Sequence, residues 1–274
     1  MPELYIPQGA VTLDKSEPAQ IRLGIQGFPK TGKTWSALTF PNPVIYNSDR
    51  ALGAHIGRAD VVEIRAYGSY IKTNAKDECL DFLSREGPKF KPHQTVIVDG
   101  LTTLELSYHA AWRRNPVISR ATGAVDDRKE WGLKEVYFDE LCNAINALPC
   151  HAILICHEQP MSDKDGSDNG KIRPLMTGKT RDKLVSRFSD WVRQLTTEKP
   201  KDVPSPEKLA LWGMKNGDEW KAMCAKFPGN TIYYWVLEGD NSFDGGTSSL
   251  VNPPKFIPAN YESFVRYMRK PISA

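Results

Sequence analysis

GFPKTGKT, residues 27–34, is the stretch that decides the fold. It satisfies the phosphate-loop pattern G-x-x-x-x-G-K-S/T in full. A stretch of mixed apolar and polar residues that is typical of a strand precedes it at residues 20–26, and a stretch with helix character follows at residues 32–39. A chance match to this pattern in a chain of this length has a probability of roughly one in a hundred, and the correct flanking elements lower it further. The sequence therefore predicts a nucleotide-binding loop.

The residue types in this loop suit a triphosphate. Glycines allow the backbone to curl so that several N–H groups converge on phosphate oxygens, and the following helix directs its positive end at the same anion. Lys33 is expected to reach the β- and γ-phosphates, and the Thr34 hydroxyl to bind Mg²⁺. The chain has no N-K-x-D stretch to read guanine, so the expected cofactors are ATP and Mg²⁺. The predicted contacts are Gly27, Phe28, Pro29, Lys30, Thr31, Gly32, Lys33, Thr34 and Trp35.

Polar side chains at the ends of apolar strands are the candidates for catalysis. Asp99 closes the stretch TVIVD at residues 95–99, which is the Walker B arrangement, so we expect it to hold Mg²⁺ together with Thr34. Asp49, just past the stretch VIYN, is the first choice for the group that activates water. His157 ends the stretch AILICH, from which it is expected to touch the γ-phosphate and report hydrolysis. The predicted catalytic set is Lys33, Asp49, Asp99 and His157.

Two other carboxylates are weaker candidates for the group that activates water. Glu158 follows the stretch that His157 ends, and Glu105 lies in the helix expected after Asp99. The alternative for each is an ordinary surface carboxylate.

Short apolar stretches alternate with helical ones along the first two thirds of the chain. This alternation predicts an α/β fold with a mostly parallel sheet covered by helices on both faces. A polar, turn-rich stretch at residues 161–170 is expected to be a mobile loop, and the end of the chain, residues 259–270, to form an amphipathic helix. The expected strands cover residues 20–26, 44–47, 94–98, 152–156, 191–195 and 231–237, and the other expected helices cover residues 78–83, 101–113 and 129–148.

Proline-containing breaks divide the chain into an N-terminal arm at residues 1–19, a core at residues 20–198 and a C-terminal extension at residues 199–274. The extension contains Trp212, Trp220 and Trp235. These tryptophans form either a subunit interface or a second small core.

The composition is that of an ordinary soluble globular protein, with 40% hydrophobic and 25% charged residues among 274. No stretch approaches the roughly 18 consecutive apolar residues of a membrane span. The first ten residues lack the basic start and apolar run of a secretory signal, and the five scattered cysteines do not form a disulfide framework. We therefore expect a cytoplasmic protein without a membrane partner.

The net charge is only +3, so local charge must indicate any nucleic-acid partner. Residues 171–187 carry six basic side chains and one acidic one. A second basic group consists of Arg113, Arg114 and Arg120, with Trp112 beside them. Basic loops with an aromatic side chain for stacking are typical of single-strand binding, although an ordinary solvated face is the alternative. Lys179 or Arg181 could instead reach the γ-phosphate of a neighbouring subunit as a finger. The nucleic-acid candidates are Arg113, Arg114, Arg120, Lys164, Lys171 and Arg173.

These motifs together resemble a known family over residues 20–195. GFPKTGKT, Asp49, TVIVDGLT, HAILICHE and RPLMTGKTRDKLVSRFSDWV are similar to the small RecA-like NTPases of bacteriophages. Those proteins belong to the AAA-domain nucleotide-binding family, which includes phage single-strand annealing proteins. The resemblance implies a RecA-like P-loop NTPase core with ATPase activity; the small C-terminal extension lies outside the resemblance.

The resemblance also implies partners and roles. It implies assembly into a homo-oligomeric ring or filament, and action on single-stranded DNA in phage recombination with a phage single-strand-binding protein or nuclease. Lys33 and Thr34 match the family's phosphate loop, Asp99 its Walker B aspartate and His157 its strand-end sensor. Asp49 is shorter than the glutamate usual in RecA-like enzymes, so slow hydrolysis is expected.

Two other functions stay open. A phosphotransferase could use the same loop and the basic residues 171–187 as an arginine-bearing lid over a small acceptor. An annealing protein without catalysis could use ATP only as an assembly ligand.

Overall fold

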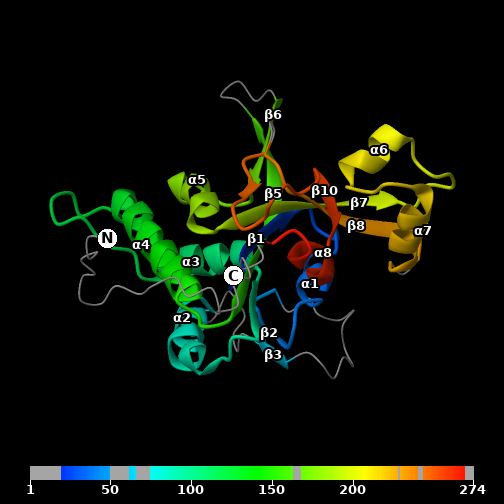
Figure 1. Ribbon diagram of the computed structural model, residues 1–274. Coiled ribbons are helices and arrows are strands. Elements are labelled where there is room, and N and C mark those ends of the chain that lie inside the picture. The colour runs from blue at the N-terminus through cyan, green and yellow to red at the C-terminus, as the bar shows by residue number, and fades with distance from the viewer. Residues whose placement is uncertain are drawn as a thin grey trace, which may run out of the picture.

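A central sheet built largely from parallel strands organises the molecule (Figure 1). The computed structural model describes residues 20–49, 62–65, 75–162, 168–227, 229–239 and 243–268. The strand order along the sheet is β10-β8-β7-β1-β5-β4-β2-β3. The strands from β7 to β3 in this order are parallel: β7 (Asp190–Glu198), β1 (Arg22–Gly27), β5 (His151–Ser162), β4 (Thr95–Asp99), β2 (Pro43–Asn47) and β3 (Val62–Arg65).

The remaining strands of the described ranges are antiparallel to their neighbours. β8 (Thr231–Val236) pairs with β7, and β10 (Phe256–Pro258) pairs with β8. β6 (Asp168–Pro174) pairs with the outer part of β5, and β9 (Gly246–Thr247) with the start of β7. The expected α/β fold with a mostly parallel sheet is confirmed.

Apolar side chains bury both faces of the sheet, which explains why its strands are almost continuously apolar. In β2, Val44 and Tyr46 enter one core while Ile45 enters the other. The first core packs against α2 (Ala75–Glu86), α3 (Leu101–Arg114) and α4 (Asp127–Asn146). The second packs against α1 (Lys33–Ala37) and α8 (Tyr261–Val265). The other elements of the described ranges are the short 3₁₀ turns η2 (Gly87–Lys89) and η3 (Val185–Arg187) and the helices α5 (Lys179–Leu184), α6 (Pro206–Leu211) and α7 (Gly217–Ala225).

The C-terminal segment continues the sheet through β8 and β10. Trp235, from β8, is fully buried in the second core. Trp220 is buried in a third, smaller core with Leu209, Met223 and Phe227, and Trp212 packs against it. α6 and α7 lie beyond β7 and β8, on the opposite side of the molecule from α2, α3 and α4 (Figure 1). Of the two roles considered for these tryptophans, the structure shows core packing.

Two expectations about local structure are wrong. β5 continues to Ser162 and forms an antiparallel hairpin with β6, so the described residues of the stretch expected as a mobile loop, 161–162 and 168–170, belong to strands. The sequence did not predict this hairpin because its two strands extend beyond the apolar core and are rich in polar residues there. Residues 163–167 lie outside the described ranges. The expected helix at residues 259–270 is reduced to α8, which the Asn260 side chain caps by accepting a hydrogen bond from the Ser263 backbone N–H.

Candidate nucleotide-binding site

The loop between β1 and α1 has the curled backbone that its glycines predict. Lys30 and Gly32 have positive φ angles of 65° and 78°. A Cβ at Gly27 would lie 2.7 Å from the Gln194 carbonyl oxygen, and one at Gly32 would lie 2.6 Å from the ring of Tyr233. Gly32 is therefore required both for conformation and for space, and Gly27 for space.

The side chain of Gln194, on β7, anchors the phosphate loop. The Gln194 amide donates a hydrogen bond to the Thr31 carbonyl at 2.7 Å. Its side-chain oxygen accepts another from the indole N–H of Trp235 at 2.9 Å. Because all three residues are buried, the loop is anchored to β7 and β8.

Lys33 lies inside the curl. Its Nζ donates to the carbonyl oxygens of Gly27 and Phe28, each at 2.8 Å, and lies 3.3 Å from Nδ1 of His157. Burial lowers the pKa of Lys33, although neighbouring acidic groups oppose this shift. A cation held by main-chain carbonyls at the first turn of α1 is placed to meet an anion there.

Thr34 and Asp99 form the second part of the site. The Thr34 hydroxyl donates to Oδ2 of Asp99 at 2.7 Å. Burial raises the pKa of Asp99 to about 6, although the bond from Thr34 favours the ionised form. The Thr34 hydroxyl and the Asp99 carboxylate are hard oxygen ligands of the kind that divalent cations prefer. A divalent cation would also stabilise the ionised form of Asp99, which burial disfavours. The pair therefore fits Mg²⁺, which would supply positive charge against the phosphate oxygens.

Asp49 and His157 form the third part. Oδ1 of Asp49 accepts a short hydrogen bond from the Thr103 hydroxyl, and its Oδ2 lies 3.8 Å from Nε2 of His157. His157 thus stands between Asp49 and Lys33. Burial lowers the pKa of His157, and the Lys33 cation lowers it further, so its ring is neutral near pH 7.

The strand order explains why these residues meet. Gly27 of β1 is level with His157 of β5, and Asn47 of β2 is level with Asp99 of β4. Because all four strands are parallel, their carboxyl ends meet at one edge of the sheet. The structure thus brings together Lys33, Asp49, Asp99 and His157, the four residues predicted as catalytic; their roles stay predictions.

The comparison with protein families agrees with this geometry. Residues 19–222 match the family model described as an AAA domain. The chain belongs to the AAA-domain family. It is therefore a P-loop protein of the nucleotide-binding, ATPase type. A search of curated proteins finds no match.

Trp35 of this AAA domain contacts the C-terminal segment. Its ring packs against Tyr233 and Phe227, with centroid distances of 5.4 and 5.8 Å. Tyr233 in turn lies against Gly32. Sequence reasoning missed this contact between the C-terminal segment and the phosphate loop.

The two weaker carboxylate candidates are engaged elsewhere. Glu158 accepts bonds from Nε and a terminal nitrogen of Arg193 at 3.0–3.1 Å, and its side chain is fully buried. Glu105 accepts a hydrogen bond from Lys134 at 2.8 Å and is also buried. These buried ion pairs argue against either carboxylate as the group that activates water, and neither is the surface carboxylate considered as the alternative. Arg193 was missed, although an arginine inside the apolar stretch WVRQL was a signal for a buried partner.

Three basic side chains of residues 171–187 form ion pairs with acidic side chains among the described residues. Lys183 pairs with Glu135 at 2.8 Å and Arg187 with Asp139 at 2.5 Å, both on α4. Arg173 pairs with Asp244 at 2.6 Å. Much of the basic segment at residues 171–187 is therefore neutralised within the domain.

Other basic candidates differ in environment. Lys171 is exposed on β6, and a terminal nitrogen of Arg181 lies 3.1 Å from the sulfur of Met161. Lys164 and the side chain of Lys179 lie outside what the structure describes. The finger role of Lys179 or Arg181 stays a prediction.

Arg113, Arg114 and Arg120 are exposed and form no ion pair within the described part of the chain. Trp112, the aromatic residue expected to stack beside them, is only 8% exposed, so that expectation is wrong. Trp112 is buried because it continues the row Leu101, Leu104 and Tyr108 along the core face of α3.

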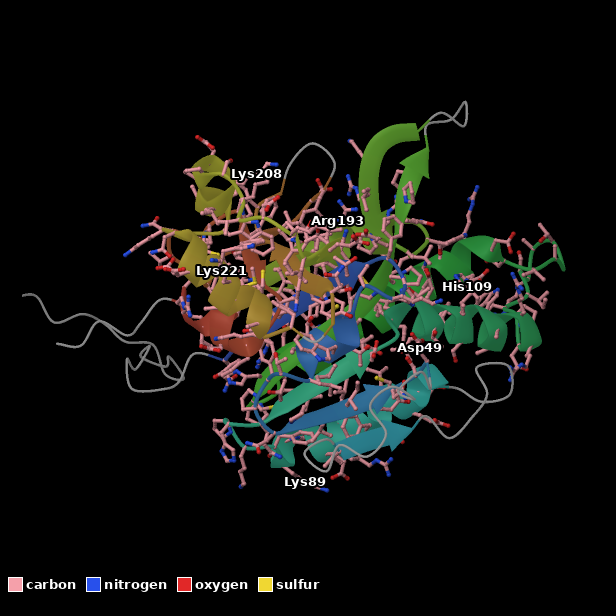
Figure 2. The ribbon with its side chains drawn as sticks, turned by 90° about the vertical axis from the view of Figure 1, so that its right-hand side faces the viewer. Asp49, Lys89, His109, Arg193, Lys208 and Lys221 are labelled. Atoms are coloured by element: carbon pink, nitrogen blue, oxygen red, sulfur yellow. The ribbon has the colours of Figure 1, made fainter. Side chains whose placement is uncertain are left out.

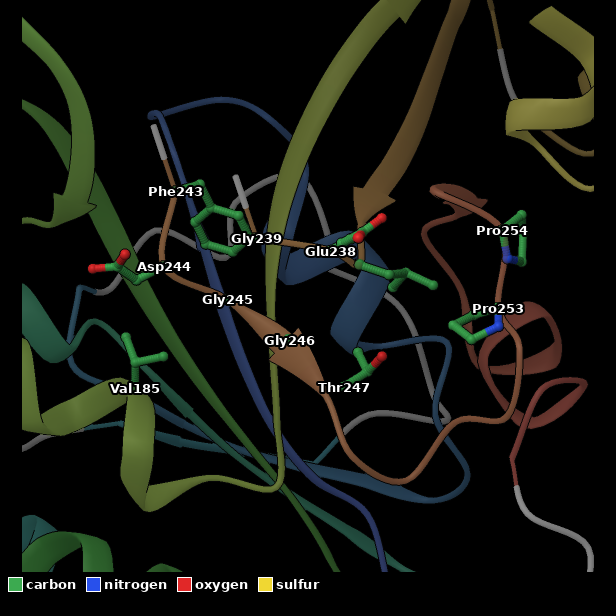
Figure 3. A pocket seen from close by; sticks show the side chains of 11 residues that line it. Val185, Glu238, Gly239, Phe243, Asp244, Gly245, Gly246, Thr247, Pro253 and Pro254 are labelled. Carbon is green, nitrogen blue, oxygen red and sulfur yellow. The ribbon is translucent and has the colours of Figure 1, made fainter. Parts of the chain in front are cut away.

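A pocket of about 790 Å³ in the described part of the chain is separate from the nucleotide site. It lies beside β9 and η3, and Figure 3 shows its lining of glycines, prolines, Val185 and Phe243. Its two charged side chains, Glu238 and Asp244, are acidic, which disfavours a phosphate. Among the helices in the described ranges, none combines the length and apolar character that a membrane crossing needs.

Proposed function

We propose that this AAA domain binds ATP with Mg²⁺ at residues 27–34 and hydrolyses it slowly. We further propose that the nucleotide cycle controls binding of single-stranded DNA during annealing or strand exchange in phage recombination. The observation that carries the ATPase part is the convergence of Lys33, the Thr34–Asp99 pair and the Asp49–His157 pair at one edge of the sheet.

Each residue has a role that its contacts support. Lys33 leaves its carbonyl partners to bind the terminal phosphates, and Thr34 with Asp99 holds Mg²⁺. Asp49 orients the attacking water and accepts its proton, with Thr103 fixing the carboxylate. His157, on β5, lies near both Lys33 and Asp49. A change at the γ-phosphate that moves either side chain is therefore transmitted to β5. The short reach of Asp49 supports a slow reaction.

The DNA part is supported by Arg113, Arg114 and Arg120, which are exposed and form no ion pair with the residues that the structure describes. The role in phage recombination, the ring or filament and the phage partner proteins rest on the family resemblance alone. ATP turnover measured with and without single-stranded DNA tests the coupling. We expect stimulation and salt-sensitive DNA binding; absence of both would reject the DNA-dependent part and leave ATP binding to be judged separately.

An ATP-assembled annealing protein without catalysis is the second candidate. The observation that favours it is the engagement of Asp49 by Thr103, which limits its freedom to contact water. This function predicts DNA pairing at full rate with a non-hydrolysable ATP analogue. The phosphotransferase has less support, because Lys183 and Arg187 of the expected lid are ion-paired with α4.

A further inference from the structure

A pocket of about 650 Å³ opens between α3 and α4, lined by Leu106, His109, Arg113, Arg114, Trp131 and Thr177, among others. We call it the α3–α4 pocket. Its volume lies in the range that holds small ligands. His109 lies on the side of α3 and α4, whereas Lys208 and Lys221 lie across the molecule on α6 and α7 (Figure 2).

The aromatic wall of the pocket is fixed yet open. Trp131 is 45% exposed, although its ring contacts three groups. A Cβ at Gly178 would lie 3.2 Å from the ring, the Lys134 Nζ lies 4.4 Å from its centroid, and the His109 ring meets it edge-on at 5.9 Å. A rigid, half-exposed indole offers a stacking surface at little cost in side-chain entropy.

The charged wall consists of two guanidinium groups. Arg113 and Arg114 occupy the last turn of α3 and form no ion pair within the described ranges. The acidic group of the pocket, Glu130, lies 2.7 Å from Nδ1 of His109, so its carboxylate is already bonded. The pocket therefore offers unneutralised positive charge beside an apolar, aromatic surface.

We propose that the α3–α4 pocket binds one nucleotide of a single-stranded nucleic acid, with the base against Trp131 and Leu106 and the phosphate against Arg113 and Arg114. Aromatic stacking combined with basic phosphate contacts is how proteins hold single strands without reading sequence. A duplex keeps its bases inside the stack, so its bases cannot enter. This inference rests on the proposed function, because it assigns the DNA contact which that function requires.

The pocket is joined to the nucleotide site through α3. Thr177 on its rim bonds Glu105 through its backbone N–H at 3.0 Å and its hydroxyl at 2.7 Å. Glu105 lies on α3, and Thr103, earlier on this helix, donates a hydrogen bond to Asp49. A strand bound in the pocket is therefore held by the same helix that positions the carboxylate predicted to activate water.

The test measures binding of a labelled oligo(dT) of about 20 nucleotides and of a matched abasic oligomer to the full chain. Trp131→Ala is expected to weaken oligo(dT) binding about tenfold, with little effect on the abasic oligomer, and Trp131→Phe to restore most of the affinity. Arg113→Ala and Arg114→Ala are expected to weaken binding of both oligomers. Each should also lower the salt slope by about 0.7 for every phosphate that the variant no longer neutralises. Leu133→Ala and Arg128→Ala, exposed on α4 outside the pocket, are the matched controls.

Thermal unfolding of each variant verifies that it is folded. Unchanged oligo(dT) affinity in Trp131→Ala, while the unaltered chain binds, would overturn the pocket but leave DNA binding by another surface intact. No binding by the unaltered chain would contradict the pocket and the DNA part of the proposed function together, with ATP binding unaffected. A loss of self-association in Trp131→Ala without loss of oligo(dT) affinity would identify the surface as an interface between copies of the chain and also overturn the proposal.

Discussion

Replacing Asp99 with asparagine is predicted to stabilise the nucleotide-free chain while removing its use of Mg²⁺. Asp99 is buried at the end of β4 and bonds Thr34. An asparagine has nearly the same shape and can still accept the Thr34 hydroxyl bond through its carbonyl oxygen. The substitution therefore removes the charge and little else.

The size of the effect follows from the pKa of Asp99. Burial raises it from the usual 3.8 to about 6, which disfavours the ionised form in the folded chain by about 3 kcal/mol at neutral pH. Because the folded pKa lies above the unfolded one, the folded chain binds more protons between pH 3.8 and about 6. Stability is therefore lost as the pH rises through this window, and Asp99→Asn should regain up to about 3 kcal/mol above it.

Urea unfolding without nucleotide at pH values of about 4 and about 7.5 measures the effect. The free energy of unfolding of Asp99→Asn should exceed that of the parent chain at the higher pH, and the gap should close at the lower one. Asp202→Asn, at an exposed carboxyl before α6, is the control that should show no such gap. Calorimetry should show that Mg²⁺ no longer strengthens ATP binding to Asp99→Asn. A variant that is less stable than the parent at the higher pH, or changed equally at both, would refute the electrostatic account of this carboxylate.

Three further predictions concern the same edge of the sheet. Lys33→Ala should lower ATP affinity at least about 100-fold in a fluorescence titration, since it removes the cation facing the phosphates, while circular dichroism stays unchanged; unaltered affinity would remove Lys33 from the site. Asp49→Asn should retain ATP binding but lower turnover by about 10²–10⁴-fold, and full turnover would shift water activation to another group. Arg193→Ala should destabilise the chain by about 3–5 kcal/mol in urea unfolding because it leaves the Glu158 charge buried and unpaired. A change below about 1 kcal/mol would show that water or another cation replaces Arg193.

The sequence predicted the parts of the site that depend on one element and its ends. The phosphate loop follows from glycines at fixed spacing, and Asp99 from an apolar stretch closed by a carboxylate. Trp112 could also have been placed correctly, because it lies four residues after Tyr108 and eight after Leu104, which marks the core face of a helix. Its position beside two arginines was the weaker signal.

The hairpin of β5 and β6 was not predictable in the same way. Outside the apolar core its strands carry polar residues on both faces, so neither alternation nor burial distinguishes them from a loop. The 3.6-residue and two-residue periods reveal an element only where one of its faces is buried.

By itself, the sequence determined that a triphosphate loop lies between a strand and a helix, and that polar groups close the strands that follow. It did not determine which of those groups meet. Asp49, Asp99 and His157 converge because β2, β4 and β5 are neighbours, and Glu158 is withdrawn from the site because β7 places Arg193 against it. The order of parallel strands is fixed by how helical crossovers pack across the whole sheet, so only the tertiary structure could decide these contacts.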